Sequence, residues 1–418
     1  MKYNHYHSWR IAIYWEKLAG LWPYREKVYN NIIRTWLLLL IISVSIPVAA
    51  KIVEEFGINV KIVVENSFGV MLCLGVLAKV IVAIRFKNNV RINSHVYQYS
   101  LFTLSLQLLK RKQIYDTIFN HISTIRDLEE AKVLQEHYDY GLRFSFYYEG
   151  IIMVLVILFH CFHILIVIFN YFFNESDMIK MIPFHLEYFV DEVKYFYYIC
   201  VHLMVSSIAF FVGIFAFDCA FFMQIQHICA LFKIVTLRLE RTFKWETEDN
   251  LNICNSTKKN KKVYNCILSA IKLHLEVIKM VDSIEEIYNI CMFVILVENM
   301  VGIGGSLYII HMYAYDLLQV VKYSTIFIAA VVHFYVMFTQ GQNIIDSSLC
   351  VFNACYNCPW YSWNKNLRQM LFIIMARSIK SCKITGGLVF VISMETYEKM
   401  MKIGFSCYAV FKMREDFS

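Results

Sequence analysis

The chain carries seven stretches of mostly apolar residues, and their lengths approach what a helix needs to cross a lipid bilayer. A helix needs about 20 consecutive apolar residues to span the hydrocarbon core. The third stretch is the most apolar, and the last is interrupted by Glu395, Glu398, Lys399 and Lys402. The pattern predicts an all-α membrane protein with seven transmembrane helices. They cover residues 36–50, 63–84, 151–173, 195–217, 287–310, 320–338 and 388–411.

The composition favours a membrane-embedded body over soluble domains. Hydrophobic residues make up 58% of the 418 residues and charged residues 17%, whereas soluble domains carry about 25% charged residues. The net charge is a modest +7, and the densest basic run, residues 258–262, is typical of a cytosolic loop near anionic lipid. We therefore expect a lipid bilayer around the chain and no nucleic-acid partner.

The distribution of Lys and Arg predicts the orientation in the membrane. Thirty of the 40 basic residues fall in segments 1–34, 85–143, 233–283 and 341–385, which alternate with the poorly basic connections. Basic loops stay in the cytosol, so we expect a cytosolic N-terminus and an extracellular C-terminus. This is the reverse of a G-protein-coupled receptor. Of two sequons, Asn174-Glu-Ser176 then lies outside and Asn255-Ser-Thr257 inside, so glycosylation is expected at Asn174 alone.

The basic connections are themselves expected to be helical. Segments 88–143 and 219–283 place apolar residues at helical spacing, for example Ile118, Ile122 and Ile125. Helices therefore should extend below the membrane and pack into a cytosolic anchor bundle.

No pattern typical of an enzyme is present. The sequence contains no HExxH, GxSxG, P-loop or GxGxxG motif, so we expect no catalytic residues and no cofactor. His160 and His163 lie three residues apart on one helical face, where two polar contacts in a cavity are a better interpretation than a metal site. Charged residues inside spans are candidate functional residues. For Lys79, Asp218 and Glu298, buried pairing and a functional role both remain open.

The outer halves of several spans are aromatic and weakly polar. Such a lining suits a small, volatile, mostly apolar ligand held by dispersion, stacking and a few hydrogen bonds. Ordinary packing within a helical bundle is the alternative. The candidate ligand-binding residues are Asn66, Ser67, Met71, Leu155, Phe159, His160, His163, Tyr197, Tyr198, Val201, His202, Val205, Tyr323, Ser324 and Phe327.

The last span carries a mixed apolar and polar face. Lys399, Ile403, Ser406 and Val410 recur at helical spacing, and a lipid-facing stripe would not carry Lys or Ser. A face that borders a water-filled axis could carry them, with Val410 as a hydrophobic constriction. One helix cannot enclose a pore, so this interpretation requires several subunits around an axis.

Four short stretches carry a resemblance to a known family. They are Leu18-Ala-Gly-Leu-Trp-Pro-Tyr24, Leu77-Ala-Lys-Val80, Ala354-Cys-Tyr-Asn-Cys-Pro-Trp-Tyr361, and a final signature running from Thr385-Gly-Gly through Met394-Glu-Thr-Tyr397 to Lys402-Ile-Gly-Phe-Ser-Cys-Tyr408. In their order, and with the reversed topology, they resemble the insect odorant receptors. Gly404 and Cys407 depart from the family's usual small hydroxyl and aromatic residues, and Lys399 and Lys402 add positive charge beside a cation pathway.

The resemblance implies the odorant-binding subunit of a ligand-gated, non-selective cation channel. It implies a heterotetramer with the shared odorant co-receptor in the plasma membrane of olfactory sensory neuron dendrites. The pore would be built by four last helices, with Ile403, Ser406 and Val410 lining it and Val410 matching the family's gate valine. It also implies one membrane domain over 1–418, with a six-helix body at 36–338 that holds the ligand cavity, a cytosolic anchor segment at 339–385 and a pore helix at 386–413.

Three other classes of membrane protein are alternatives to an odorant-gated channel subunit. A G-protein-coupled type of receptor would have no pore and an extracellular N-terminus. A gustatory-type receptor channel usually ends its last helix in Gln-Phe, whereas this chain has Val410-Phe411. An integral membrane enzyme or transporter would need a catalytic or relay constellation.

Overall fold

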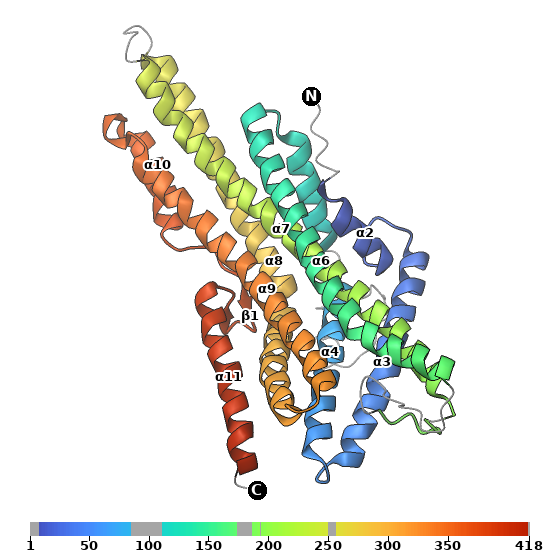
Figure 1. Ribbon diagram of the computed structural model, residues 1–418. Coiled ribbons are helices and arrows are strands. Elements are labelled where there is room, and N and C mark those ends of the chain that lie inside the picture. The colour runs from blue at the N-terminus through green and yellow to red at the C-terminus, as the bar shows by residue number, and fades with distance from the viewer. Residues whose placement is uncertain (1–7, 85–110, 174–185, 193, 250–255, 417–418) are drawn as a thin grey trace, which may run out of the picture.

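The computed structural model describes residues 8–84, 111–173, 186–192, 194–249 and 256–416, and these residues form a long bundle of helices (Figure 1). Residues 111–124 are helical as well. The predicted all-α membrane fold is confirmed. The elements are α2 (Arg10–Leu18), α3 (Lys27–Glu55), α4 (Val60–Ile84), α6 (Leu128–Phe173), α7 (Phe196–Asp249), α8 (Ser256–Met312), α9 (Leu317–Asn357), η1 (Trp360–Ser362), α10 (Lys365–Ser378), β1 (Thr385–Gly386), β2 (Phe390–Val391) and α11 (Met394–Asp416).

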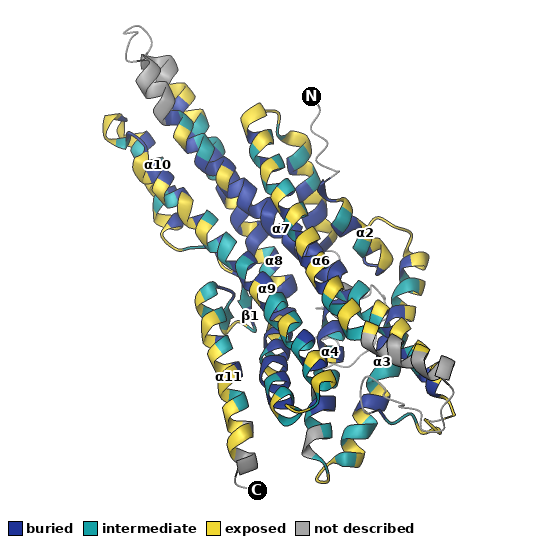
Figure 2. Ribbon diagram, viewed as in Figure 1, coloured by how far each residue is buried: buried dark blue, intermediate teal, exposed yellow. Residues whose placement is uncertain are grey.

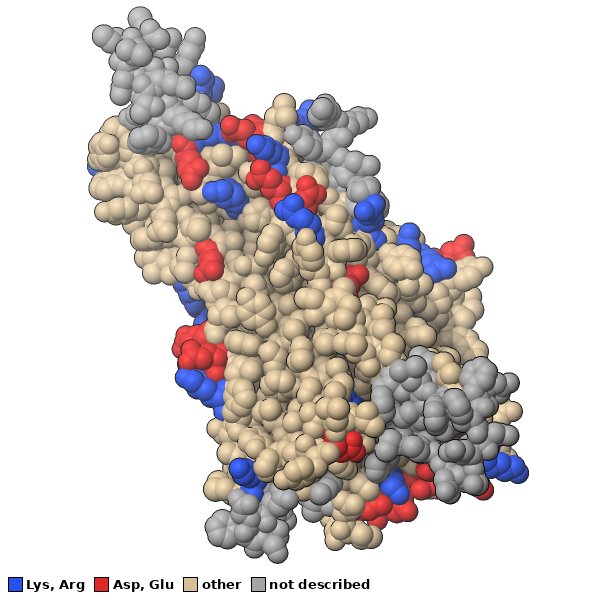
Figure 3. Space-filling model, in the orientation of Figure 1, with Lys and Arg blue, Asp and Glu red and all other residues tan. Residues whose placement is uncertain are grey.

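Each of the first six predicted spans falls almost entirely within one long helix. Within the described residues, six helices are long and apolar enough to cross a membrane, namely α3, α4, α6, α7, α8 and α9. The helices extend far past the apolar stretches: α8 has 57 residues, or about 85 Å at the rise of an α-helix. Figure 3 shows that the charged side chains on one face gather mainly toward the two ends of the molecule.

The predicted span 388–411 is wrong at its beginning, as is the predicted start of the pore helix at residue 386. Residues 385–391 form a small antiparallel hairpin instead, in which Thr385 pairs with Val391. Gly387 and Leu388 both have positive φ angles, which a helix does not allow. The helix α11 therefore begins only at Met394.

The core is centred on the middle of α7. Every residue from 215 to 232 is buried, and Figure 2 shows the buried stretch at the centre of the bundle. A helix that is buried on all sides must be surrounded by others, and α2, α6, α8 and α9 all pack against α7. Leu231, Val235 and Leu239 are fully buried, so the bundle continues beyond the predicted fourth span.

The short helix α2 is anchored to this core through buried polar contacts. The Arg111 guanidinium pairs with the Glu16 carboxylate, and the Tyr115 hydroxyl donates a hydrogen bond to Glu16 Oε1 at 2.7 Å. Burial raises the pKa of Glu16. The chain then turns at Gly20, whose φ is +68° and where an added Cβ would lie 2.7 Å from the Asn30 carbonyl oxygen.

The helix α11 packs mainly against α8, at a point where both helices carry glycine. A Cβ added to Gly304 would lie 3.0 Å from Cys407 Cβ, and one added to Gly404 would lie 3.0 Å from Ile303 Cγ2. The hairpin before α11 is attached to α8 by Asn289, whose Nδ2 donates to Thr385 Oγ1 at 2.8 Å. The opposite face of α11 is exposed (Figure 2).

Candidate functional site

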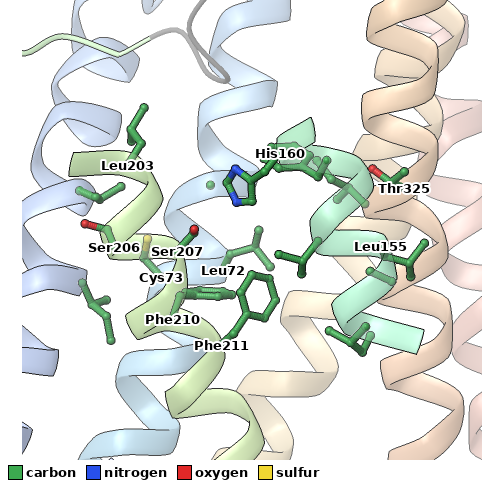
Figure 4. Close-up of a pocket in the computed structure, with 18 of the residues that line it drawn as sticks. Leu72, Cys73, Leu155, His160, Leu203, Ser206, Ser207, Phe210, Phe211 and Thr325 are labelled. Carbon is green, nitrogen blue, oxygen red and sulfur yellow. The ribbon is translucent and has the colours of Figure 1, made fainter. Parts of the chain in front are cut away.

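An apolar cavity of about 200 Å³ lies among five of the long helices (Figure 4). A mostly apolar cavity with a few polar groups is the usual form of a small-molecule site. Residues of α3, α4, α6, α7 and α9 line it: Ile41, Val44, Val48, Gly69, Leu72, Cys73, Ile152, Leu155, Val156, Phe159, His160, Leu203, Ser206, Ser207, Phe210, Phe211, Thr325, Ile326 and Ala329.

Three of the residues predicted from sequence line the cavity, and all three are on α6. They are Leu155, Phe159 and His160. The ring of His160 lies edge-on to the ring of Phe159, with a centroid distance of 5.1 Å. The side chain of His163 lies outside the described part of the chain, and so does Asn174.

On α4 the predicted residues and the lining residues occupy different positions of the same helix. The prediction named Asn66, Ser67 and Met71, whereas the cavity is lined by Gly69, Leu72 and Cys73. Asn66 is fully buried, and within the described part of the chain neither polar atom of its amide has a hydrogen-bond partner. Asn66 precedes Gly69, the first lining residue on α4, by three positions, which is about one helical turn.

On α7 the cavity lies deeper than predicted and faces a different side of the helix. Tyr197, Tyr198, Val201 and Val205 are exposed on the outside of the bundle. His202 is held instead between Ser43 Oγ, 2.9 Å from its Nε2, and the Tyr188 hydroxyl, 2.8 Å from its Nδ1. The side that does line the cavity carries Leu203, Ser206, Ser207, Phe210 and Phe211, which repeat at helical spacing.

On α9 the lining side chains are Thr325, Ile326 and Ala329, each close in sequence to a predicted residue. The predicted Ser324 and Phe327 are partly buried but do not line the cavity. The predicted Tyr323 is fully buried in a small cluster with Tyr308 and Ile309.

The polar groups of the cavity differ in whether their hydrogen bonds are already made. Ser207 Oγ donates to the Met204 carbonyl at 2.8 Å, and Thr325 Oγ1 donates to the Lys322 carbonyl at 2.7 Å. Ser206 Oγ is buried and has no hydrogen-bond partner among the residues that the structure describes. A buried polar group that lacks a partner is costly, so a bound molecule with a hydrogen-bonding group would gain most at Ser206.

Farther along α4 and α7 than the cavity, the structure brings together two of the charged residues that the sequence marked as candidates. Lys79 Nζ lies 2.9 Å from Asp218 Oδ1. The Tyr148 hydroxyl donates to Asp218 Oδ2 at 2.8 Å, and His333 Nε2 lies 3.3 Å from the same oxygen. Lys79 and Asp218 are thus partners within a network across α4, α6, α7 and α9. The nearby carboxylate of Glu298 lies against Gly75.

The exposed face of α11 contains the predicted pore residues. Ile403, Ser406 and Val410 are all exposed, and Val410 is 60% accessible. On the other side, Met400 and Gly404 are buried, and Tyr408 lies edge-on to His311 at 6.0 Å. The two lysines form ion pairs along the exposed helix, Lys399 with Glu395 and Lys402 with Glu398. This helix therefore has one packed face and one mixed face that the described residues leave uncovered.

Among the described residues, no group of three or more His, Cys, Asp or Glu side chains could hold a metal ion. Cys355 and Cys358 are both buried near the end of α9, and Cys358 Sγ lies 3.2 Å from the Ala354 carbonyl oxygen.

Comparisons with known proteins agree with this architecture. The sequence model of the family described as 7tm Odorant receptor matches residues 96–405. Odorant receptor 67c of Drosophila melanogaster is 24% identical over 208 residues, which cover 49% of this chain and 48% of that protein. Odorant receptor 49a of the same species is 27% identical over 92 residues, covering 22% and 23%. The Odorant receptor coreceptor of Drosophila melanogaster is 22% identical over 161 residues, which cover 36% of this chain and 32% of that protein. The chain therefore matches less than half the length of each of these relatives.

A solved structure is similar along almost the whole chain. The insect olfactory receptor OR5 from Machilis hrabei, in complex with eugenol, has a TM-score of 0.77 and 10% identity, and the match covers 98% of this chain and 99% of that one. At this identity the likeness shows the fold alone. The family match, in contrast, extends over most of the sequence. This chain belongs to the insect odorant receptor family.

Proposed function

We propose that this chain is the odorant-binding subunit of a ligand-gated, non-selective cation channel that acts with the shared odorant co-receptor. The observation that carries the proposal is the apolar cavity among α3, α4, α6, α7 and α9, in which none of the described residues forms a hydrogen bond with the buried Ser206 hydroxyl. The family match and the similarity to the Drosophila coreceptor support it.

The cavity suits a small, volatile, mostly apolar molecule with one polar group. Its hydrocarbon walls provide dispersion contacts, and the aromatic rings of Phe159, Phe210 and Phe211 offer stacking surfaces. The hydroxyl of Ser206 could orient an alcohol, phenol or carbonyl group. The olfactory receptor OR5 from Machilis hrabei was solved in complex with eugenol, a phenol of this general kind.

The uncovered face of α11 supports an assembly around a central pore. A single helix cannot enclose a pathway, so four last helices, from this chain and the co-receptor, would surround one axis. Ile403, Ser406 and Val410 would line it, with Val410 as the hydrophobic constriction. Ligand binding would open the pore if the ligand binds the open conformation more tightly than the closed one.

The proposed site of action is the plasma membrane of olfactory sensory neuron dendrites. There the N-terminus would lie in the cytosol and Asn174 would carry the glycan. A tag placed before residue 1 should therefore bind antibody only after the cells are permeabilised. Binding on intact cells would favour a G-protein-coupled type of receptor.

Co-expression with the co-receptor under voltage clamp tests the function. A panel of volatile alcohols, phenols, esters and ketones is applied to cells with verified surface expression. We expect at least one compound to evoke an inward cation current that is absent in cells that express the co-receptor alone. A panel without any response, despite surface expression, would contradict the proposal.

A further inference from the structure

A second hollow adjoins the cavity on the outside of the bundle. This α6–α7 groove has a volume of about 250 Å³ and is lined by residues of α2, α6 and α7: Trp15, Met153, Val156, Ile157, His160, Cys161, Met204, Ser207, Ile208, Phe211, Val212 and Phe215. Val156, His160, Ser207 and Phe211 line the groove and the cavity alike. The two spaces thus share four lining side chains, two on α6 and two on α7.

The rim of the groove is made of hydrocarbon that faces away from the protein. Ile157 is 53% exposed and Ile208 65% exposed, and Met153 and Met204 are exposed beside them. All four lie on helices that are apolar enough to cross a membrane. Exposed side chains of this kind would contact lipid, so the groove opens toward the hydrocarbon of the bilayer.

The outer end of the cavity is, in contrast, covered by packed side chains. Leu186, Ile199 and Leu203 form a buried cluster with Val48, and two of these, Val48 and Leu203, also line the cavity. The backbone N–H of Glu187 donates to the Pro47 carbonyl oxygen at 3.2 Å. The Tyr188–His202–Ser43 contacts lie over the same end.

We propose that apolar ligands enter the cavity sideways from the bilayer, through the α6–α7 groove, with His160 and Phe211 as the side chains that must move aside. Figure 4 shows both rings between α6 and α7, at the cavity. An aromatic ring can change rotamer without any helix moving. A volatile apolar molecule concentrates in lipid over water, so this route begins where such a ligand accumulates.

The inference rests on the proposed function, because it takes the cavity to be the ligand site. Its test, however, needs no channel current. Cys73 lines the cavity but not the groove, and Cys161 lines the groove but not the cavity. Cys350 is exposed on α9 and lines neither space. The three thiols therefore report on the cavity, the groove and the water-accessible surface.

The experiment measures how fast each thiol is alkylated in open membrane fragments that contain the full chain and the co-receptor. The probes are N-phenylmaleimide, which is apolar, and a sulfonated maleimide, which is charged, and the readout is mass spectrometry of the cysteine peptides. We expect N-phenylmaleimide to modify Cys161 and then Cys73, and the sulfonated reagent to modify Cys350 but not Cys73. Equal modification of Cys73 by both reagents would show an aqueous route and overturn the proposal. No modification of Cys73 by either reagent would overturn it as well.

A matched pair of variants locates the route. Ile157 and Leu158 are neighbours on α6 with similar exposure, 53% and 52%, but only Ile157 lines the groove. Ile157→Trp should slow the alkylation of Cys73 by N-phenylmaleimide roughly fivefold or more, because the indole fills the groove, while Leu158→Trp should leave the rate unchanged. Ile208→Ala should accelerate the alkylation of Cys73, and this variant replaces Ile157→Trp in the test if Ile157→Trp does not reach the membrane.

Equal rates of Cys73 alkylation in all of these variants would overturn the proposal. If the odorant panel evokes no current but alkylation still depends on the groove, that result counts against the proposed function alone.

Discussion

Lys79 Nζ lies 2.9 Å from Asp218 Oδ1, and both side chains are almost completely buried inside the bundle. An isolated charge in such surroundings is very costly, and a buried ion pair persists only with further hydrogen bonds to its atoms. Tyr148 and His333 provide these on the second carboxylate oxygen. The pair lies about two helical turns from the nearest cavity-lining residues of α4 and α7. It therefore holds together two of the helices that line the cavity.

Removal of one member of this pair should destabilise the receptor severely. Asp218→Leu leaves the Lys79 ammonium buried without its partner, a change that typically costs 3–5 kcal/mol. We expect a large loss of surface expression and a lower melting temperature by fluorescence-detected size-exclusion chromatography. The double variant Lys79→Met with Asp218→Leu should recover much of that loss.

The exposed pair of Lys132 and Glu136 on α6 is a suitable control. Exposed ion pairs contribute little to stability, so Glu136→Gln should have the same melting temperature as the wild-type protein. If Asp218→Leu also had the wild-type melting temperature, the buried network would have no structural role.

The unpartnered hydroxyl of Ser206 should select for ligands with a hydrogen-bonding group. Ser206→Ala removes a hydrogen bond worth about 1 kcal/mol, so the half-maximal concentration of an activating alcohol or phenol should rise about fivefold. An activating hydrocarbon of similar size should be unaffected. Dose–response curves under voltage clamp measure both.

Ser207→Ala is the matched control, because Ser207 Oγ already donates to the Met204 carbonyl. Its dose–response curves should be close to those of the wild type. A larger effect from Ser207→Ala than from Ser206→Ala would reverse the assignment of the polar contact.

The close approach of α11 to α8 should depend on Gly304 and not on Gly305. An added methyl group at Gly304 lies 3.0 Å from Cys407 Cβ, whereas one at Gly305 meets nothing within 4 Å. Ala normally stabilises a helix by about 0.5–1 kcal/mol relative to Gly. Gly305→Ala should therefore raise the melting temperature or leave it unchanged, while Gly304→Ala should lower it and shift the ligand dose–response. The opposite order would mean that α11 does not pack here.

The exposed Val410 should control conduction if the mixed face of α11 borders a pore. Val410→Ala shortens the side chain at the proposed constriction, so we expect a larger leak current without ligand or altered relative permeability to Na⁺ and Cs⁺. Reversal potentials and basal currents of the co-expressed channel measure this. If gating and permeation of Val410→Ala were identical to those of the wild type, Val410 would not line the ion pathway.

The sequence was a good guide to the helices and a weaker guide to their rotation. Apolar stretches are visible along one chain, so six spans could be placed and the family resemblance could be recognised. On α6, Leu155, Phe159 and His160 share one face, and that face does line the cavity. On α7 the predicted face, with Tyr198 and Val201, points outward. The sequence could not indicate this, because aromatic residues occur both on helix faces that contact lipid and on faces that contact other helices.

Two further features depended on contacts between distant segments. The apolar residues at the beginning of the last span predict a helix, whereas these residues form a hairpin that Asn289 of α8 holds in place. Likewise, Lys79 and Asp218 are 139 positions apart in the sequence, so their pairing depends on how α4 and α7 pack together, which no local sequence pattern indicates. The unpartnered state of Ser206 is also a property of the packed bundle, which no local pattern could indicate.

We propose that a ligand in the cavity of this chain opens a cation pathway. The most direct measurement records the current evoked by an activating volatile compound from the co-expressed wild type and from Leu155→Trp, at matched surface expression. Leu155 lines the cavity, and an indole there would occupy the space of the ligand. We expect a cation current in the wild type, and in Leu155→Trp a current that is lost or that requires a much higher ligand concentration. An unchanged dose–response in Leu155→Trp would contradict it.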